Sequence, residues 1–148
     1  MTKQKDVLYS YITMNNTIEK LKASDIRITP QRVMVYQVLA ARKKHLTAEE
    51  IYERIKPKAP AISLATIYTI LEVFKEKKLI SEIRIKFNKS CFEVRVDFHH
   101  HFYCQSCGKI FDIDIVPCAA LEKKEVNGHL IESLQGYFYG LCKDCKAG

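Results

Sequence analysis

Apolar residues follow helical spacing over the first half of the chain. From about residue 17 to residue 78 they recur three or four positions apart, as in helices that bury one face. Thr29-Pro30 places a capping hydroxyl before a proline, and Thr47-Ala48-Glu49-Glu50 has the spacing of a capping box. Pro57 and Pro60 end the second of these stretches. The pattern therefore predicts short successive helices that begin at these caps.

A further helix is expected over residues 63–78, where Ser63 can cap the first turn. Its buried stripe is predicted to consist of Leu64, Ile67, Leu71 and Phe74. The outward face is then expected to show Ala65, Thr66, Thr69 and Val73. Small side chains on an outward face let the backbone of a helix approach another surface closely.

Alternation replaces the helical spacing after this helix. Two alternating runs flank a turn expected at Asn88-Lys89-Ser90, with Ile83, Ile85 and Phe87 before it and Phe92, Val94 and Val96 after it. This pattern predicts a hairpin. Short helices followed by a hairpin are typical of a winged helix, in which one helix enters the major groove of DNA. A small helical domain with a hairpin can also bind a protein, so the pattern alone leaves the partner open.

Charge is unevenly distributed along the 148 residues. The net charge is +7, but residues 1–92 hold 18 Lys and Arg against 9 acidic residues, whereas residues 93–148 hold 6 against 8. All of the positive excess lies in the helical half, as expected if that half binds a polyanion such as duplex DNA. A solvated basic surface is the alternative. In the DNA interpretation, the side chains expected near phosphates are Lys75, Lys77, Lys78, Arg84, Lys86 and Lys89.

Length and composition restrict the class of protein. A chain of this length holds one domain or two small ones, and no run approaches the roughly 18 apolar residues that span a bilayer. The N-terminal residues show no secretory signal, so we expect a cytoplasmic protein whose six cysteines stay reduced. Metal ligation is then favoured over disulfides.

The second half of the chain holds two C-x-x-C motifs, Cys104-Gln105-Ser106-Cys107 and Cys142-Lys143-Asp144-Cys145. Two such pairs can complete a tetrahedral shell of four thiolates around zinc, and this closed shell has a structural role. A thioredoxin-like redox pair is the competing use, but it needs only one motif, placed where a strand enters a helix. We therefore predict a structural zinc on Cys104, Cys107, Cys142 and Cys145.

A histidine triplet, His99-His100-His101, precedes the first motif. On a strand, His99 and His101 point to one side and His100 to the other, so two imidazoles can bind one metal. Oxygen donors are available from Glu93, Asp97, Asp112 and Asp114. Such a mixed set suits Fe²⁺, Mn²⁺ or Zn²⁺, although a histidine triplet can also be a solvated strand end. The residues expected to be structural and not ligands are Cys91, Cys118 and His129.

Four segments resemble the successive signatures of the ferric uptake regulator (Fur) family: Arg27-Ile28-Thr29-Pro30-Gln31-Arg32, His45-Leu46-Thr47-Ala48-Glu49-Glu50-Ile51-Tyr52, Ser63-Leu64-Ala65-Thr66-Ile67-Tyr68 and residues 99–110. The resemblance runs from about residue 17 to Cys145, with the motifs in the same order. Together with a change of composition near residues 88–96, it implies an α+β architecture. We expect a winged-helix DNA-binding domain over residues 1–88, a hinge over 89–96 and a small α/β dimerisation domain with the zinc over 97–148.

The resemblance also implies a regulatory metal site, whose ligands by position are His45, Glu93, His99, His101 and Asp112. This layout is most similar to the peroxide-sensing branch of the family, in which metal-catalysed oxidation of ligand histidines releases DNA. By position, the oxidation-sensitive residues are His45 and His99. Asp112 matches this branch, whereas Glu93 stands where the branch usually has Asp. The implied cofactors are a structural Zn²⁺ and a regulatory Fe²⁺ or Mn²⁺.

The expected function is a metal-dependent transcriptional repressor that binds a double-stranded DNA operator as a homodimer, with no membrane and no small organic substrate as partner. DNA contacts are expected from Arg27, Gln31, Arg32, Ser63, Ala65, Thr66, Tyr68 and Thr69. Within the family, an iron- or zinc-uptake repressor is the alternative. From another class, the alternative is a structural zinc module that binds RNA or protein. An enzyme is not expected, because neither H-E-x-x-H nor H-x-E with P-C-x-x-C occurs.

Overall fold

The computed structural model describes residues 14–41, 45–86, 88–94, 97, 99–115, 124–132 and 134–147. The chain divides into two compact units, Met1–Val96 and Asp97–Gly148. Within the described residues, no helix is both long and apolar enough to cross a membrane. The architecture is α+β, as predicted, with helices followed by strands.

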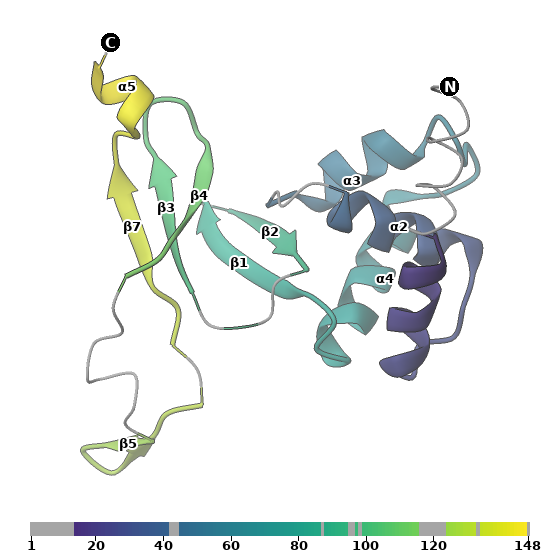
Figure 1. Cartoon of the computed structure of the whole chain (residues 1–148), viewed down its shortest axis with the longest axis horizontal. Helices are drawn as coiled ribbons and strands as arrows, with labels where there is room; N and C mark the ends of the chain where they lie inside the picture. Colours follow the sequence, from purple (N-terminus) through teal and green to yellow (C-terminus); the bar gives the residue numbers. More distant parts are fainter. Residues whose placement is uncertain are drawn as a thin grey trace. The chain divides into compact units, whose positions relative to one another are not determined.

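Helices form most of the first unit. Residues 14–23 are helical, and α2 (Pro30–Ala40), α3 (Ala48–Ile55) and α4 (Leu64–Glu76) follow (Figure 1). Thr29 Oγ1 accepts a hydrogen bond from the Arg32 amide at the start of α2. Both bonds of the capping box at α3 form, with Thr47 N 2.8 Å from Glu50 Oε2 and Glu50 N 3.2 Å from Thr47 Oγ1. The helix starts predicted from the capping residues are therefore confirmed.

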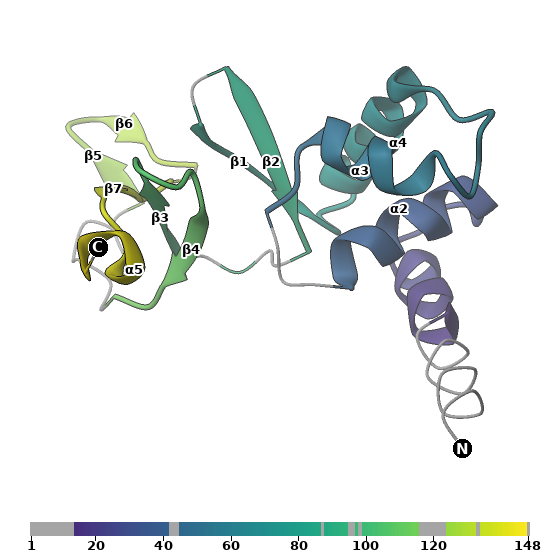
Figure 2. The same ribbon diagram turned by 90° about the horizontal axis from the view of Figure 1, so that it is seen from above.

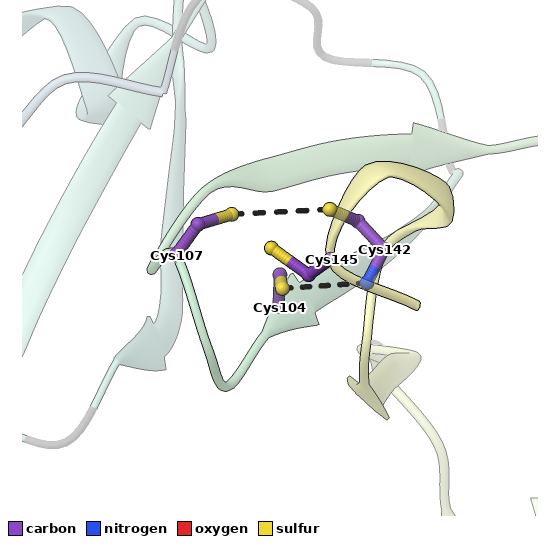
Figure 3. A group of neighbouring side chains, drawn as sticks. All are labelled: Cys104, Cys107, Cys142 and Cys145. Atoms are coloured by element: carbon purple, nitrogen blue, oxygen red, sulfur yellow. Dashed lines mark hydrogen bonds between the residues drawn. The ribbon is translucent and has the colours of Figure 1, made fainter. Parts of the chain in front are cut away.

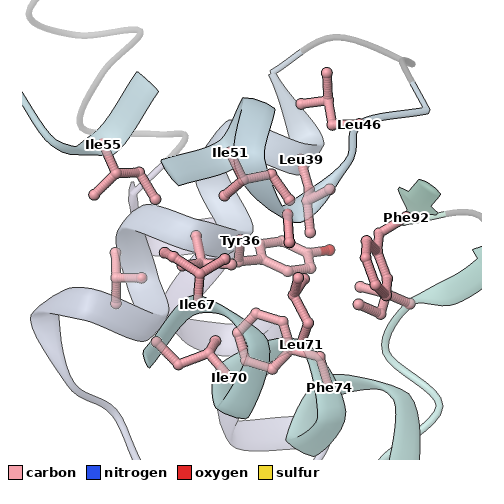
Figure 4. Close-up of a cluster of buried hydrophobic side chains, with 14 of the residues drawn as sticks. Tyr36, Leu39, Leu46, Ile51, Ile55, Ile67, Ile70, Leu71, Phe74 and Phe92 are labelled. Atoms are coloured by element: carbon pink, nitrogen blue, oxygen red, sulfur yellow. The ribbon is translucent and has the colours of Figure 1, made fainter. Parts of the chain in front are cut away.

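The core of this unit lies between α2, α3 and α4, and Figure 4 shows Phe92 of the hairpin facing the same cluster. Tyr36 of α2 packs edge-on against Phe74 of α4, with ring centroids 6.2 Å apart. Three positions of α4 differ from the predicted pattern. Ile70 is buried, because it lies between Ile67 and Phe74 on the same face, whereas Leu64 is only partly buried. Val73, expected to point outward, is partly buried and packs against the core.

The hairpin consists of β1 (Ser81–Lys86) and β2 (Lys89–Glu93), which pair antiparallel. Its turn is tighter than predicted, because Asn88 takes a positive φ of 59° and β2 begins directly after it. The second alternating run was thus placed too late, because residues 89–93 form a strand of the hairpin. Alternation does not show this strand because Cys91, Phe92 and Glu93 are all buried. Phe87 and Val96 lie outside the described residues.

The second unit is built on a three-stranded sheet with the order β4-β3-β7. Strand β3 (His100–Cys104) pairs antiparallel with β4 (Ile110–Ile113) and parallel with β7 (Tyr137–Gly140), and α5 (Lys143–Ala147) follows β7 (Figure 1). Strands β5 (Glu125–Val126) and β6 (His129–Leu130) form a separate small hairpin (Figure 2). Gly136, just before β7, leaves room for the His100 imidazole, which a Cβ atom there would overlap.

We expect Thr47→Ala to lower the free energy of unfolding by about 1 kcal/mol, because it removes the side chain that accepts from the Glu50 amide at the start of α3. Urea unfolding of the purified protein measures this loss. As a control, Thr69→Ala removes the same group from the exposed face of α4 and should change stability by less than about 0.5 kcal/mol. Equal losses in the two variants would contradict the capping role of Thr47.

Candidate metal centres

The four cysteines of the C-x-x-C motifs converge within the second unit. Cys104 ends β3 and Cys107 lies in the turn that follows, while Cys142 and Cys145 come from the start of α5 and its first turn (Figure 3). The four Sγ atoms all lie within 4.8 Å of one another. The structure thus brings together the four residues that the motif spacing predicted.

Backbone hydrogen bonds position these sulfurs. The Gly108 amide donates to the Cys104 carbonyl over 2.8 Å, and Gly108 has a φ of +68°, which a glycine adopts without strain. The Cys142 amide donates to Cys104 Sγ over 3.3 Å, and Cys107 Sγ lies 3.9 Å from Cys142 Sγ. The turn after β3 and the start of α5 are therefore held against each other around the sulfurs.

The electrostatics of the cluster favour a bound cation. Amide groups of Cys107 and Cys142 donate to the Cys104 sulfur and lower the pKa of Cys104 to about 6. The hydroxyl of Ser106 lowers the pKa of Cys145, but the neighbouring sulfurs outweigh it and raise this pKa to about 12. Four sulfurs this close can all be thiolates only around a positive charge. Such a closed shell of four thiolates matches a structural zinc site.

The first unit holds a pair of imidazole and carboxylate donors. His45 Nε2 lies 3.1 Å from Glu93 Oε2. The backbone explains why the pair forms, because Leu46 and Phe92 exchange two hydrogen bonds of 3.1 and 2.8 Å. This bridge places His45, which precedes Leu46, beside Glu93, which follows Phe92.

The second unit holds a separate group of two histidines and one carboxylate. The rings of His99 and His101 lie on the same side with centroids 4.3 Å apart, and Asp112 of β4 pairs with His101 across the sheet. Asp112 Oδ1 is 3.5 Å from His99 Nε2 and 3.8 Å from His101 Nε2. His100 points the other way, against Phe138. The predicted orientation of the triplet is therefore confirmed.

The pair in the first unit and the group in the second unit both combine imidazole nitrogen with carboxylate oxygen. This combination of donors suits Fe²⁺, Mn²⁺ or Zn²⁺ better than it suits soft metals. Asp97 and Asp114, the other carboxylates considered from the sequence, do not join either group in the described residues. Cys91 is fully buried opposite Ile83, and burial raises the pKa of its thiol, so it behaves as the small hydrophobic residue expected. His129 is exposed on β6, and Cys118 lies outside the described residues.

The residues expected to contact DNA lie at the starts of α2 and α4. Arg27 and Gln31 are exposed, and Arg32 donates to the Arg27 carbonyl over 3.0 Å. At α4, the Ser63 and Thr66 hydroxyls are 2.9 Å apart. Exposed side chains on this helix are Ala65, Tyr68 and Thr69.

Ion pairs within the first unit engage some of the expected phosphate-binding cations. Lys75 Nζ lies 2.7 Å from Glu82 Oε2, and Arg84 Nε lies 3.4 Å from Glu82 Oε1. Partial burial would raise the pKa of Glu82, but hydrogen bonds from Lys75, Ser90 and Arg84 lower it to about 2. Glu82 was not predicted as a functional residue, because ion pairs between a helix and a hairpin leave no periodic signal in the sequence.

Comparisons with known proteins place the chain in a family. The model of the ferric uptake regulator family matches residues 23–135. The peroxide-responsive repressor PerR of Staphylococcus epidermidis is 35% identical over 140 residues, which cover 90% of each chain. PerR of Staphylococcus saprophyticus is 36% identical over 135 residues, covering 90% of this chain and 91% of its own.

Two solved structures resemble the chain in fold and sequence. PerR of Streptococcus pyogenes has a TM-score of 0.51 and 29% identity, covering 90% of this chain and 92% of its own. The ferric uptake regulator of Helicobacter pylori, described as having three functional metal-binding sites, has a TM-score of 0.67 and 25% identity, covering 90% of this chain and 93% of its own. The chain belongs to the ferric uptake regulator family of transcriptional regulators.

Proposed function

We propose that the protein is a metal-dependent DNA-binding repressor that senses peroxide. The observation that carries this proposal is the occurrence of a mixed histidine and carboxylate group in each unit, His45 with Glu93 and His99 with His101 and Asp112. Similarity to peroxide-responsive repressors over 90% of the chain supports the same function. The protein would act in the cytoplasm, where its thiols stay reduced.

In this proposal the two metal centres have different roles. Zn²⁺ on the four cysteines holds α5 against the turn after β3 and leaves no position for a substrate. Fe²⁺ or Mn²⁺ binds His45, Glu93, His99, His101 and Asp112 and so joins the two units. Binding free energy then favours the one arrangement of the units that offers all five donors. We propose that this arrangement is the one that binds DNA.

The histidines would also be the targets of oxidation. Fe²⁺ held by these residues would catalyse cleavage of the O–O bond of peroxide next to the ligands, and the imidazole would be oxidised by two electrons overall. One oxygen atom of the peroxide is added to an imidazole carbon of His45 or His99, and the other leaves as water. An oxidised imidazole is a weaker ligand, so the units separate and DNA is released.

Asp112 and Glu93 favour different branches of the family. Asp112 is the residue of the peroxide-sensing branch, whereas Glu93 replaces the Asp that is usual there. An iron- or zinc-uptake repressor is therefore the second candidate, and oxidation of the iron-loaded protein distinguishes the two.

The first unit would bind duplex DNA and the second would form a homodimer. The exposed face of α4 offers the small side chains of Ala65 and Thr69, which suit a close approach to the major groove, and the positive excess of residues 1–92 suits its phosphates. The second unit exposes an unusual number of large apolar side chains, as expected of a face that a second copy of the chain covers. They include Leu130, Ile131, Leu134, Phe138, Tyr139 and Leu141.

We expect Cys142→Ser to reduce bound zinc from one ion per chain to a small fraction and to lower the melting temperature by 10 °C or more, on the order of a lost structural metal. Elemental analysis and thermal unfolding measure both effects. Cys91→Ala, a cysteine outside the cluster, should keep the full zinc content. A zinc-loaded, equally heat-stable Cys142→Ser protein would contradict the structural role.

DNA binding should require the second metal and should weaken steeply with salt. We expect Mn²⁺ to raise affinity for a selected duplex at least tenfold, and affinity to fall more than tenfold between 50 and 200 mM salt, because several phosphates are neutralised. Gel shifts with and without Mn²⁺ measure both. Equal affinity for DNA without Mn²⁺ would contradict the co-repressor role of the metal. An affinity that does not change with salt would contradict phosphate binding by a basic surface.

The oxidation proposal predicts a mass gain of one oxygen, about 16 Da, on the peptides of His45 or His99 after the Fe²⁺-loaded protein meets micromolar peroxide. Asp112→Glu moves the carboxylate by about 1.5 Å and should reduce this oxidation at least threefold while Mn²⁺-dependent DNA binding survives. Asp114→Glu is the matched control and should oxidise like the parent. If the parent gains no oxygen on any histidine, the peroxide-sensing function is contradicted and an iron- or zinc-uptake repressor becomes the favoured function.

A further inference from the structure

One side chain on the outward face of α4 is tied to another helix. Tyr68 is 43% exposed, yet its hydroxyl donates to Glu49 Oε1 of α3 over 2.9 Å. The two residues are 19 positions apart, so this bond connects α3 and α4 at the protein surface. The hydroxyl is therefore already engaged within the protein on the face expected to meet DNA.

Glu49 is itself held in place. It lies in the first turn of α3, beside the capping box. Its own backbone amide and the Tyr68 hydroxyl lower the pKa of Glu49, so the carboxylate is ionised and ready to accept. The same hydrogen bond raises the pKa of Tyr68, so the phenol stays protonated and donates. The carboxylate gives the aromatic ring a fixed point of attachment.

Packing alone does not determine the orientation of the Tyr68 ring. A cavity of about 250 Å³ adjoins it, lined by Glu49, Tyr68, Glu72, Glu82, Asn88, Lys89, Ser90 and Phe92. The ring borders open space on the side of the hairpin and solvent on the other. The bond to Glu49 is thus the contact that selects one ring orientation over a swing towards the hairpin.

This arrangement determines what Tyr68 can offer to a DNA base. Because its hydroxyl is used by Glu49, the side chain presents an apolar ring and no donor. An apolar contact in the major groove recognises the methyl group of thymine, whereas a hydroxyl would bond to several base edges. The negative charge of Glu49 also disfavours phosphates close to α3, which penalises docking in other registers.

We propose that Glu49 is a positioning residue for DNA recognition, which turns the Tyr68 hydroxyl into the protein so that the ring contacts a thymine methyl group. This inference rests on the proposed function, because it requires α4 to enter the major groove. It adds to that function the residue that positions Tyr68 to distinguish a base pair containing thymine from the others.

The test compares thymine with deoxyuridine, which lacks only the methyl group. A preferred duplex is first selected from random sequences with the Mn²⁺-loaded protein, and each thymine is then replaced in turn. In the parent, replacement at one or more positions should weaken binding about fourfold, the value of one buried methyl group. At one of these positions the effect should disappear in Glu49→Ala and in Tyr68→Phe. Glu49→Gln keeps a carbonyl oxygen that can accept from Tyr68, so this variant should keep the sensitivity to deoxyuridine at that position.

Glu53→Ala is the matched control, since it removes the same charge from an exposed position of the same helix. It should leave the deoxyuridine profile unchanged, whereas loss of the profile there would show that charge alone matters and would overturn the proposal. Tyr68→Phe breaks the bond from the other side, so the test does not depend on the folding of Glu49→Ala.

The outcomes separate the two proposals. A parent protein that selects no duplex contradicts the proposed function itself. A parent that selects DNA but is insensitive to every deoxyuridine, or keeps its profile in Glu49→Ala and Tyr68→Phe, overturns the positioning role and leaves the repressor function standing.

Discussion

Of the described residues in the second unit, only His101, Cys104 and Cys142 are buried. The first unit, by contrast, has a continuous core of apolar side chains from its helices and the hairpin. A unit of about 50 residues buries too little apolar surface to be stable by itself, and metal coordination is one of the usual substitutes. A structural zinc can contribute on the order of 10 kcal/mol to folding, comparable with the stability of a whole domain. Convergence of the four sulfurs is therefore the constraint on which the sheet, and the residues it carries, depend.

The sheet of the same unit also positions a second group of donors. Register between β3 and β4 sets Asp112 opposite His101, and the parity of the strand puts His99 on the same side. In the first unit, the bridge between Leu46 and Phe92 places His45 beside Glu93. Each half is thus built by backbone pairing inside its own unit. In the proposed function, an ion that takes donors from both groups would favour one arrangement of the units, and metal occupancy would thereby control DNA binding.

Local signals in the sequence predicted the parts of the structure that local physics determines. Capping residues such as Thr47 fix helix starts because the bonds they make span only three positions. Each C-x-x-C motif is local in the same way, and the preference of zinc for four thiolates predicted that the two motifs meet. Strand β2 was placed too late because Phe92 and Glu93 are buried on opposite sides, which removes the alternation that marks a strand. The bonds of Glu82 to Lys75 and of Glu49 to Tyr68 were not foreseen, since they join elements that only the fold brings together.

In the proposed regulatory site, one ion takes ligands from both units. Equilibrium binding of Mn²⁺ to the zinc-loaded protein, followed by electron paramagnetic resonance of the free ion, tests this in the parent, His45→Ala and His101→Ala. We expect one tight Mn²⁺ per chain in the parent, and a loss of at least tenfold in the affinity of that same ion in either variant, although the two histidines belong to different units. Two Mn²⁺ ions per chain, each sensitive to only one substitution, or an unchanged affinity in His45→Ala, would contradict it.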